Sequence, residues 1–518
     1  MRVRVPNAGE IGIVRDVQDI ALPANVWTNG QNVVMRDGSV HSVKGREEVF
    51  ASPTIKPSFA FQFEQPTEKQ WCYVGWDAVG ASPAIYTINE AGTHTDRTST
   101  LTSVETDTWD GCAFGSYPIL TNNVDTPQYW DGSAGTFADL PDFPASTQCK
   151  IIRAFRNFIV IGNVTESSTN YANVIRWSNA ADVGALPDSY DYTDPATLAG
   201  RVELSEDGGP IVDMLELRGI MYIYRESATH AMQYVKGNYV FSLSRRFTGW
   251  GVMSKNCVVE VDGQHYCFTD HDLLVHNGTT VKSIVDSTMR RFIFDALDAS
   301  NKDACFVVAN QERGEVWFCY PQLGATYATK AFVFNTKTGT SGTRELPGLI
   351  YATSGYVPRD ADDIWNNNTA TWHELLQTWS ESTSSTSKFS IVSLTYEGKK
   401  FYQEDFGYSN DGANLQSFIE RENLLLPKFN PADRVTIKAV YPQIETIGEI
   451  NVKIYVGAKE KQKGGLIWSG PYEFNPFDDH KISTRTTGRF PAIRFLFTGK
   501  GQWRLSGYDV EVQPRGGR

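Results

Sequence analysis

The chain has 518 residues, of which 41% are hydrophobic and 21% charged, and these proportions exclude a disordered, collagen-like or coiled-coil protein. Its 48 Lys and Arg against 60 Asp and Glu give a formal net charge of −12, which disfavours a protein that binds nucleic acid through phosphate contacts. Aromatic residues make up 12% of the chain and, together with 43 glycines, indicate a β-rich fold. The length suggests about three domains, or one large repetitive domain with an appendage.

The beginning of the chain shows no targeting signal. The charged stretch from Met1 to Pro6 is followed by polar residues and glycine instead of an apolar segment, so we expect no secretory signal. No run approaches the roughly 20 apolar residues of a membrane helix, so we expect no membrane insertion by this chain. The seven scattered cysteines include no C-x-x-C pair, and we expect them to be reduced, buried side chains.

Short β-segments follow one another between about residues 46 and 410, with turn signals every 8–12 residues or so. The most legible stretch alternates over 258–261, 264–268, 273–276 and 280–284, with Asp-Gly and Asn-Gly dipeptides at two of its turns. It predicts a four-stranded antiparallel meander with type I′ turns at both dipeptides. The same pattern recurs at 59–63, 71–76, 84–88, 119–120, 128–130, 158–162, 174–177, 211–217, 220–224, 231–235, 304–308, 316–320, 331–334, 391–396 and 400–402.

Repeated units of about 40–60 residues, each a sheet that cannot bury both faces alone, indicate an irregular β-propeller with inter-blade insertions. Stacked β-sandwiches are the alternative, and the uneven spacing leaves the blade count open. We expect an all-β protein in three parts, which are an N-terminal arm with the first strands at 1–45, a propeller at 46–410 with insertions at about 182–208 and 360–388, and a C-terminal β-sandwich with a basic tail at 420–518.

The C-terminal part alternates cleanly at 435–441, 450–456, 494–497 and 503–512, which predicts separate strands with Lys and Arg on the outer face. Its charge differs from that of the rest. Residues 421–518 carry a balance of +6, and residues 1–420 carry −18. The acidic part either serves solubility or provides a surface that DNA passes without sticking.

Five residues are candidates for contacts with other chains. Trp365, Trp372 and Trp379 are seven residues apart within an Asn-, Thr- and Ser-rich insertion, where they either fill a local core or contact a partner or another subunit. Arg515 and Arg518 lie in the basic C-terminal tail.

Motifs for catalysis are missing from the sequence. It contains no G-x-S-x-G, phosphate-binding loop or dinucleotide-binding motif. His265, Cys267, His271 and His276 lie close together but meet no zinc spacing, so we expect no metal and no cofactor. With 60 Asp and Glu, the sequence neither locates nor excludes the carboxylate pair of a glycosidase. We therefore nominate no catalytic residue and expect a protein that is not an enzyme.

Four groups of short motifs are spread over most of the chain: Leu22 to Val33 with Arg36 to Val40 and Lys44-Gly45, then Phe155 to Asn163 with Arg176 to Asn179, Gly249 to Ser254, and Gly488-Arg489 to Arg494-Phe495 with the basic terminus. Together these motifs resemble the tail nozzle proteins of short-tailed bacteriophages, also called tail-stabilisation or tail tubular proteins.

This resemblance implies a structural virion protein of the phage tail that is made in the host cytoplasm. It further implies a propeller with a platform-like domain and a homohexameric ring attached to the portal or head-to-tail adaptor. DNA would pass through a central channel without specific binding, and tail fibres, spikes and distal tail proteins are further candidate neighbours. The sequence has no match for a long nozzle-tip insertion.

The competing hypothesis is a propeller glycosidase or carbohydrate-binding protein that acts on host surface polysaccharide. A pocket on the propeller axis with two or three carboxylates and aromatic side chains would favour it.

Overall fold

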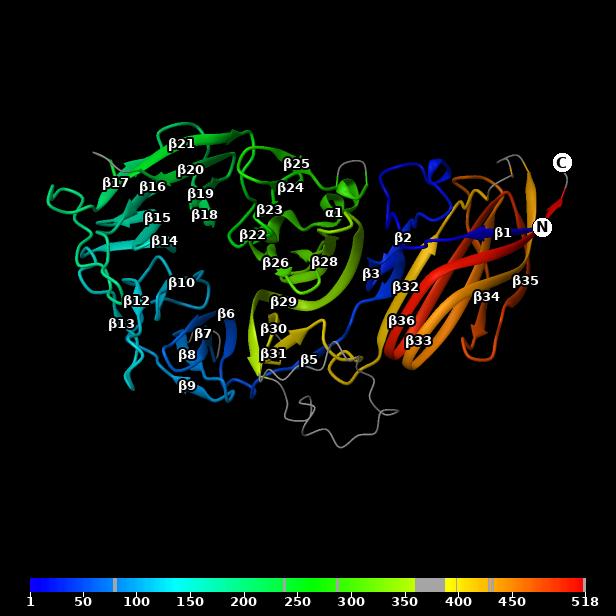
Figure 1. The fold of residues 1–518 in the computed structure, drawn as a ribbon, viewed down its shortest axis with the longest axis horizontal. Helices are drawn as coiled ribbons and strands as arrows, with labels where there is room; N and C mark the ends of the chain where they lie inside the picture. The colour runs from blue at the N-terminus through cyan, green and yellow to red at the C-terminus, as the bar shows by residue number, and fades with distance from the viewer. Residues whose placement is uncertain are drawn as a thin grey trace.

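The computed structural model describes residues 1–77, 82–235, 239–285, 288–358, 387–396, 398–426, 429 and 433–515. Strands dominate it, and they form a propeller in the left half of Figure 1 and a β-sandwich in the right half. The helices of the described residues are one α-helix, α1 (Arg290–Ala296), and two 3₁₀ turns at Asp19–Ala21 and Ala299–Ala304. The predicted all-β propeller is therefore confirmed.

Five blades are separate four-stranded antiparallel sheets. In chain order they are β6 (Lys56–Glu64), β7 (Lys69–Trp76), β8 (Ala84–Ile88) and β9 (His94–Asp96) in blade 1; β10 (Asp110–Phe114), β11 (Tyr117–Thr121), β12 (Gln128–Tyr129) and β13 (Ala138–Asp139) in blade 2; β14 (Thr147–Phe155), β15 (Phe158–Glu166), β16 (Thr169–Trp177) and β17 (Gly200–Glu203) in blade 3; β18 (Ile211–Leu217), β19 (Ile220–Arg225), β20 (Ala228–Tyr234) and β21 (Phe241–Thr248) in blade 4; and β22 (Val258–Val261), β23 (Gln264–Phe268), β24 (Leu273–His276) and β25 (Val281–Ser283) in blade 5.

Two further blades share one long strand, β29 (Ser341–Pro358). Its first half pairs with β28 (Ala328–Asn335), which continues into β27 (Glu315–Tyr320) and β26 (Phe306–Asn310) as blade 6. Its second half pairs with β30 (Ser387–Thr395), followed by β31 (Phe401–Glu404) and β5 (Arg46–Glu48), as blade 7. The innermost strands contact one another in succession from β6 to β29 and back to β6, so the described residues form a closed seven-bladed propeller.

The meander predicted from residue 258 is confirmed as blade 5, with one correction at a turn. Asp262 and Gly263 both have positive φ, at 51° and 73°, as a type I′ turn requires. Gly278 alone has positive φ in the second turn, and His276 pairs with Val281 across a four-residue loop. The loop takes this form because the side chain of Asn277 accepts the backbone N–H groups of Thr279 and Thr280.

The loop-rich segment predicted at 182–208 interrupts a blade instead of joining two. It lies mainly between β16 and β17, which pair from Val174↔Glu203 to Trp177↔Gly200 within blade 3. The second predicted insertion, at 360–388, falls almost wholly outside the described residues.

The C-terminal sandwich depends on two 26-residue strands, β33 (Arg434–Lys459) and β36 (Phe490–Arg515), which pair along their whole length. One end of this ribbon is flanked by β35 (Ile482–Gly488) and β1 (Arg2–Val5), and the other by β34 (Ile467–Phe474) and β32 (Leu415–Arg421) with β2 (Asn29–Gln31). The separate strands predicted at 435–441 and 450–456 are thus one strand, as are those at 494–497 and 503–512. Register shifts at Ile437/Ala439 and Gln443/Ile444 accompany this continuity, because bulges let a long ribbon bend from one sheet into the other.

The propeller and the sandwich form one continuous body. Strands β3 (Val33–Arg36) and β4 (Ser39–Ser42) bridge them, since β3 pairs with β29 and β4 pairs with β36. A single hydrophobic cluster runs from Tyr222 and Phe268 in blades 4 and 5 to Phe495 and Tyr508 in the sandwich. Strands of the N-terminal segment therefore belong to both parts.

Buried ion pairs join the N-terminal segment to blades 6 and 7. We call the group the latch network, and it comprises Arg36, Arg46, Arg313, Glu315, Arg344, Glu404 and Asp405. Arg344 contacts Glu404 at 2.6 Å and Asp405 at 3.4 Å, and Arg313 contacts Asp405 at 2.6 Å. Burial alone would raise the pKa of the Asp405 carboxyl, but the arginines outweigh it and hold that pKa far below its usual range.

Replacing Arg344 with Met should lower the free energy of unfolding by about 3–5 kcal/mol, because it leaves two buried carboxylates without their shared cation. Urea-induced unfolding measures this change. The matched control is Arg434→Met, because the pair between Arg434 and Glu460 is 40% and 54% exposed and its loss should cost less than about 1 kcal/mol. Similar small losses for both variants would contradict the role given to the latch network.

Candidate functional site

The structure describes one of the five predicted interface residues. Trp365, Trp372, Trp379 and Arg518 lie outside the described residues. Arg515 is exposed at the end of β36, and its Nε donates to Thr436 Oγ1 at 3.2 Å. The prediction of a partner contact at these residues stays a prediction.

Four charged residues link the innermost strands of blades 2, 3 and 4 to the segment before blade 5. We call them the axial network, and they are Asp110 in β10, Arg153 in β14, Asp213 in β18 and Lys255. Arg153 contacts Asp110 at 2.6 Å and Asp213 at 2.5 Å, and Lys255 Nζ lies 3.4 Å from Asp110. Lys255 also donates to the backbone carbonyl of Trp109 at 2.5 Å.

The backbone of the neighbouring strands completes this network. Asp110 accepts the N–H of Ile152, and Asp213 accepts the N–H of Asn256, each at 2.9 Å. Burial alone would raise the pKa of Asp110, but Arg153 and Lys255 outweigh it and lower that pKa. Each charged side chain of the axial network therefore has an ionic partner within the network, which fits a structural role better than a general acid or base.

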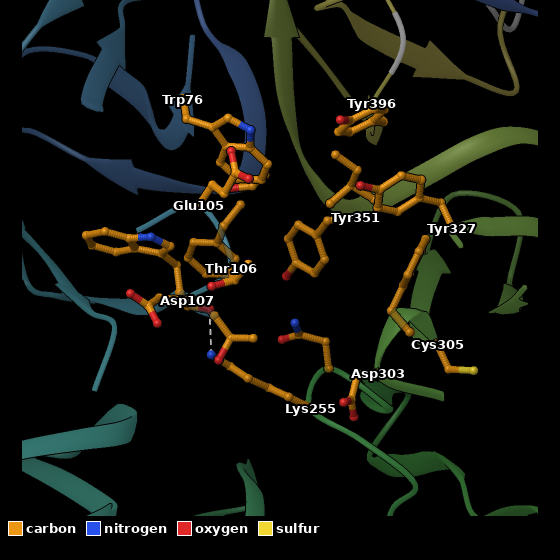
Figure 2. Close-up of a pocket in the computed structure, with 17 residues that line it drawn as sticks. Trp76, Glu105, Thr106, Asp107, Lys255, Asp303, Cys305, Tyr327, Tyr351 and Tyr396 are labelled. Carbon is orange, nitrogen blue, oxygen red and sulfur yellow. Dashed lines mark hydrogen bonds between the residues drawn. The ribbon is translucent and has the colours of Figure 1, made fainter. Parts of the chain in front are cut away.

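A cleft of about 360 Å³, the axial cleft, opens beside this network. Residues at or just before the start of several innermost strands line it, so it lies at one end of the propeller axis. Its residues are Ser58, Phe59, Trp76, Glu105, Thr106, Asp107, Thr108, Trp109, Lys255, Asn256, Asp303, Cys305, Phe306, Tyr327, Ile350, Tyr351 and Tyr396. Figure 2 shows Tyr351 between the side of the cleft formed by Tyr327 and Tyr396 and the side formed by Glu105 and Thr106.

No motif in the sequence indicates this cleft. Its residues come from positions 58 to 396 and share no spacing or motif. The acidic run at 105–107 contains a single intervening threonine and resembles an ordinary surface loop. Only the closure of the ring brings that loop opposite the tyrosines of blades 6 and 7.

Two of the clustered histidines, His265 and His276, belong to a buried hydrogen-bonded chain. Tyr224 Oη lies 2.6 Å from both His265 Nδ1 and His276 Nε2. A backbone N–H can only donate and a carbonyl can only accept, so the Gly278 N–H fixes Nδ1 of His276 as an acceptor, and the Glu216 carbonyl fixes Nε2 of His265 as a donor. With neutral rings, His276 Nε2–H donates to Tyr224, which in turn donates to His265.

Burial keeps this chain neutral. It lowers the pKa of His265 to about 4, and burial together with the neighbouring His265 lowers the pKa of His276 to about 3. The chain connects β19 of blade 4 to β23 and β24 of blade 5, so it joins two blades. No group of three or more His, Cys, Asp or Glu in the part of the chain that the structure describes could hold a metal ion.

Burial also raises the pKa values of the cysteine thiols. The thiols of Cys112, Cys149 and Cys257 have pKa values raised to about 12, so they are protonated at neutral pH. All seven cysteines are free, and six of them are buried. Among the described residues, no helix is long and apolar enough to span a membrane.

Comparison with solved structures finds several chains of low similarity. One similar chain is YCF48 bound to a D1 peptide, with 11% sequence identity and a TM-score of 0.34. The match covers 58% of this chain and 87% of the YCF48 chain. PorZ of Porphyromonas gingivalis, described as a surface component of the type-IX secretion system, has 8% identity and a TM-score of 0.35 and covers 73% of this chain and 43% of its own. AztD from Citrobacter koseri has 11% identity and a TM-score of 0.32 and covers 57% and 72%. No protein-family model and no curated protein matches the sequence.

The histidine chain should make stability depend on pH below about 6.5. Because the folded-state pKa values of about 4 and 3 lie below the ordinary value of 6.5, the unfolded chain binds protons first as the pH falls. Each histidine should therefore remove up to about 1.4 kcal/mol of unfolding free energy per pH unit between pH 6.5 and 5.

Urea unfolding at several pH values in this window measures the slope. His276→Gln should reduce the slope by the share of one histidine, whereas a replacement of the exposed His271 should leave it unchanged. Parallel pH profiles for the wild type and His276→Gln would show that the chain is not the source of the dependence.

Proposed function

We propose that this protein is a structural virion protein of a short-tailed bacteriophage tail. Several copies form a ring that attaches to the portal or adaptor and surrounds the path of DNA ejection. The observation that carries the proposal is the single continuous body of propeller and sandwich, joined by shared sheets, one hydrophobic cluster and the latch network. Such a body can transmit load between neighbours without bending at a domain boundary.

The pairing of the buried charged groups with one another supports the same proposal. The carboxylates and arginines of the latch and axial networks pair with one another across blades, and the two central histidines are neutral and fully hydrogen-bonded. These interactions stabilise the packing of the blades against one another. We therefore propose an assembly role and no catalytic role, in accord with the resemblance of the sequence to tail nozzle proteins.

The uneven charge suggests how copies and neighbours meet. The balance of −18 in residues 1–420 suits a wall that repels DNA, and the balance of +6 in residues 421–518 suits docking on an acidic surface. Complementary charges set the register of docked surfaces, and closed symmetry is what a conduit requires.

Native mass spectrometry of the purified protein should show a closed ring of about six copies at low salt. Raising the salt to about 1 M should shift the population towards smaller species, because it screens the contacts between acidic and basic surfaces. The unfolding transition, measured in parallel, should change little and serves as the control. A protein that stays a single subunit at every concentration, and does not sediment with virions, would overturn the proposal.

A further inference from the structure

The ring function leaves the axial cleft without a role, although the cleft is a well-formed cavity of about 360 Å³. Its volume lies within the range of small-molecule sites, which is roughly 300–1,000 Å³. We propose that the axial cleft binds a neutral oligosaccharide segment. The inference goes beyond the assembly role and does not depend on it.

Aromatic rings on two sides of the cleft provide flat apolar surfaces. Tyr327 and Tyr396 stack on each other, with ring centroids 4.9 Å apart and planes at 26°, and Lys56 Nζ lies 4.5 Å from the centroid of the Tyr396 ring. The ring surfaces left for a ligand are therefore those of Tyr327 and of Trp76, which lines the side formed by blade 1. The face of an aromatic ring carries partial negative charge, and the C–H groups on one face of a sugar carry partial positive charge. A pyranose ring can therefore lie flat against these side chains.

Polar groups that suit hydroxyls also line the cleft. Ser58, Thr106, Thr108 and Asn256 contribute short hydroxyl and amide groups to the lining, and Tyr351 extends between the two sides (Figure 2). A sugar hydroxyl both donates and accepts, so it pairs with each of these groups. Aromatic surfaces combined with a few convergent polar groups are the composition expected of a ligand site.

The charge of the lining selects against acidic saccharides. Glu105, Asp107 and Asp303 contribute three carboxylates, whereas the one lining cation, Lys255, is held by Asp110 and the Trp109 carbonyl. Carboxylates accept hydrogen bonds from sugar hydroxyls and repel the carboxylates of an acidic sugar. The carboxylates therefore disfavour an acidic ligand, and the aromatic rings and hydroxyl groups of the lining suit a neutral saccharide.

The floor of the cleft is already ordered. The axial network fixes Lys255 through Asp110 and Arg153, and Phe59 and Phe306 pack against Tyr351 with ring centroids 5.3 and 6.0 Å apart. A rigid site loses less conformational freedom when a ligand binds. This smaller loss of conformational freedom matters most for ligands that bind weakly, such as sugars.

Isothermal titration calorimetry with the full chain tests the proposal, with maltotriose, cellotriose and chitotriose as neutral probes. Trigalacturonate serves as the acidic probe and chitosan trimer as the cationic one. We expect at least one neutral probe to bind and the acidic probe not to bind. Trp76→Ala should weaken that binding at least tenfold, and Asp303→Asn should weaken it by a smaller factor.

Phe477→Ala is the matched control, because Phe477 is an aromatic residue that is 81% exposed and lies between β34 and β35 of the sandwich, away from the propeller (Figure 1). It should leave binding unchanged, and the melting temperatures of all variants should agree. Failure of all neutral probes, preference for the acidic or cationic probe, or binding that survives in Trp76→Ala would each overturn the proposal. The oligomer measured by native mass spectrometry is a separate readout, so the ring proposal stands or falls independently.

Discussion

The neutralisation of two adjacent buried carboxylates, Glu404 and Asp405, is the constraint on which the closed propeller depends. They lie at the end of β31, where blade 7 must be completed by the N-terminal strand β5. Their countercharges come from three places in the chain, which are Arg36 and Arg46 near the N-terminus, Arg313 before β27, and Arg344 in β29. Two buried anions are costly unless they are paired, so the carboxylates favour the arrangement that brings these segments together.

The N-terminal segment extends this constraint beyond the propeller. β3 and β4 follow one another through a tight turn, and they pair with β29 on one side and with the long ribbon strand β36 on the other. Fixing Arg36 in the latch network therefore also fixes the position of the sandwich relative to blade 6. This arrangement gives one continuous body in which residues 1–420 are acidic and residues 421–518 are basic, and the proposed ring rests on these two properties.

The sequence predicted local elements well, because alternation and turn residues act over short distances. Blade 5 was located strand by strand, and its Asp262-Gly263 turn has the predicted type. The sequence pattern predicts two separate strands in place of each of the long strands β33 and β36. Bulges and polar residues interrupt the alternation there without ending the pairing. The blade count was not predictable, because one strand serves two blades and another comes from the N-terminus.

The sites depend on distance in the fold and not on distance in the sequence. His265 and His276 were recognised as neighbours, but the partner that explains them, Tyr224, lies some forty residues earlier in another blade. The axial cleft combines residues from blades 1, 6 and 7 with residues from the loops before blades 2, 5 and 6, so no spacing in the sequence indicates it. Charge balance was the one long-range property that composition revealed directly.

Cryo-electron microscopy of the assembled protein would show both the ring and the orientation of its subunits. We expect a closed ring of rigid propeller–sandwich subunits around a passage whose wall is net acidic, with the basic sandwich directed at a neighbour. A passage lined by a net basic surface, or subunits in which propeller and sandwich move independently, would contradict it.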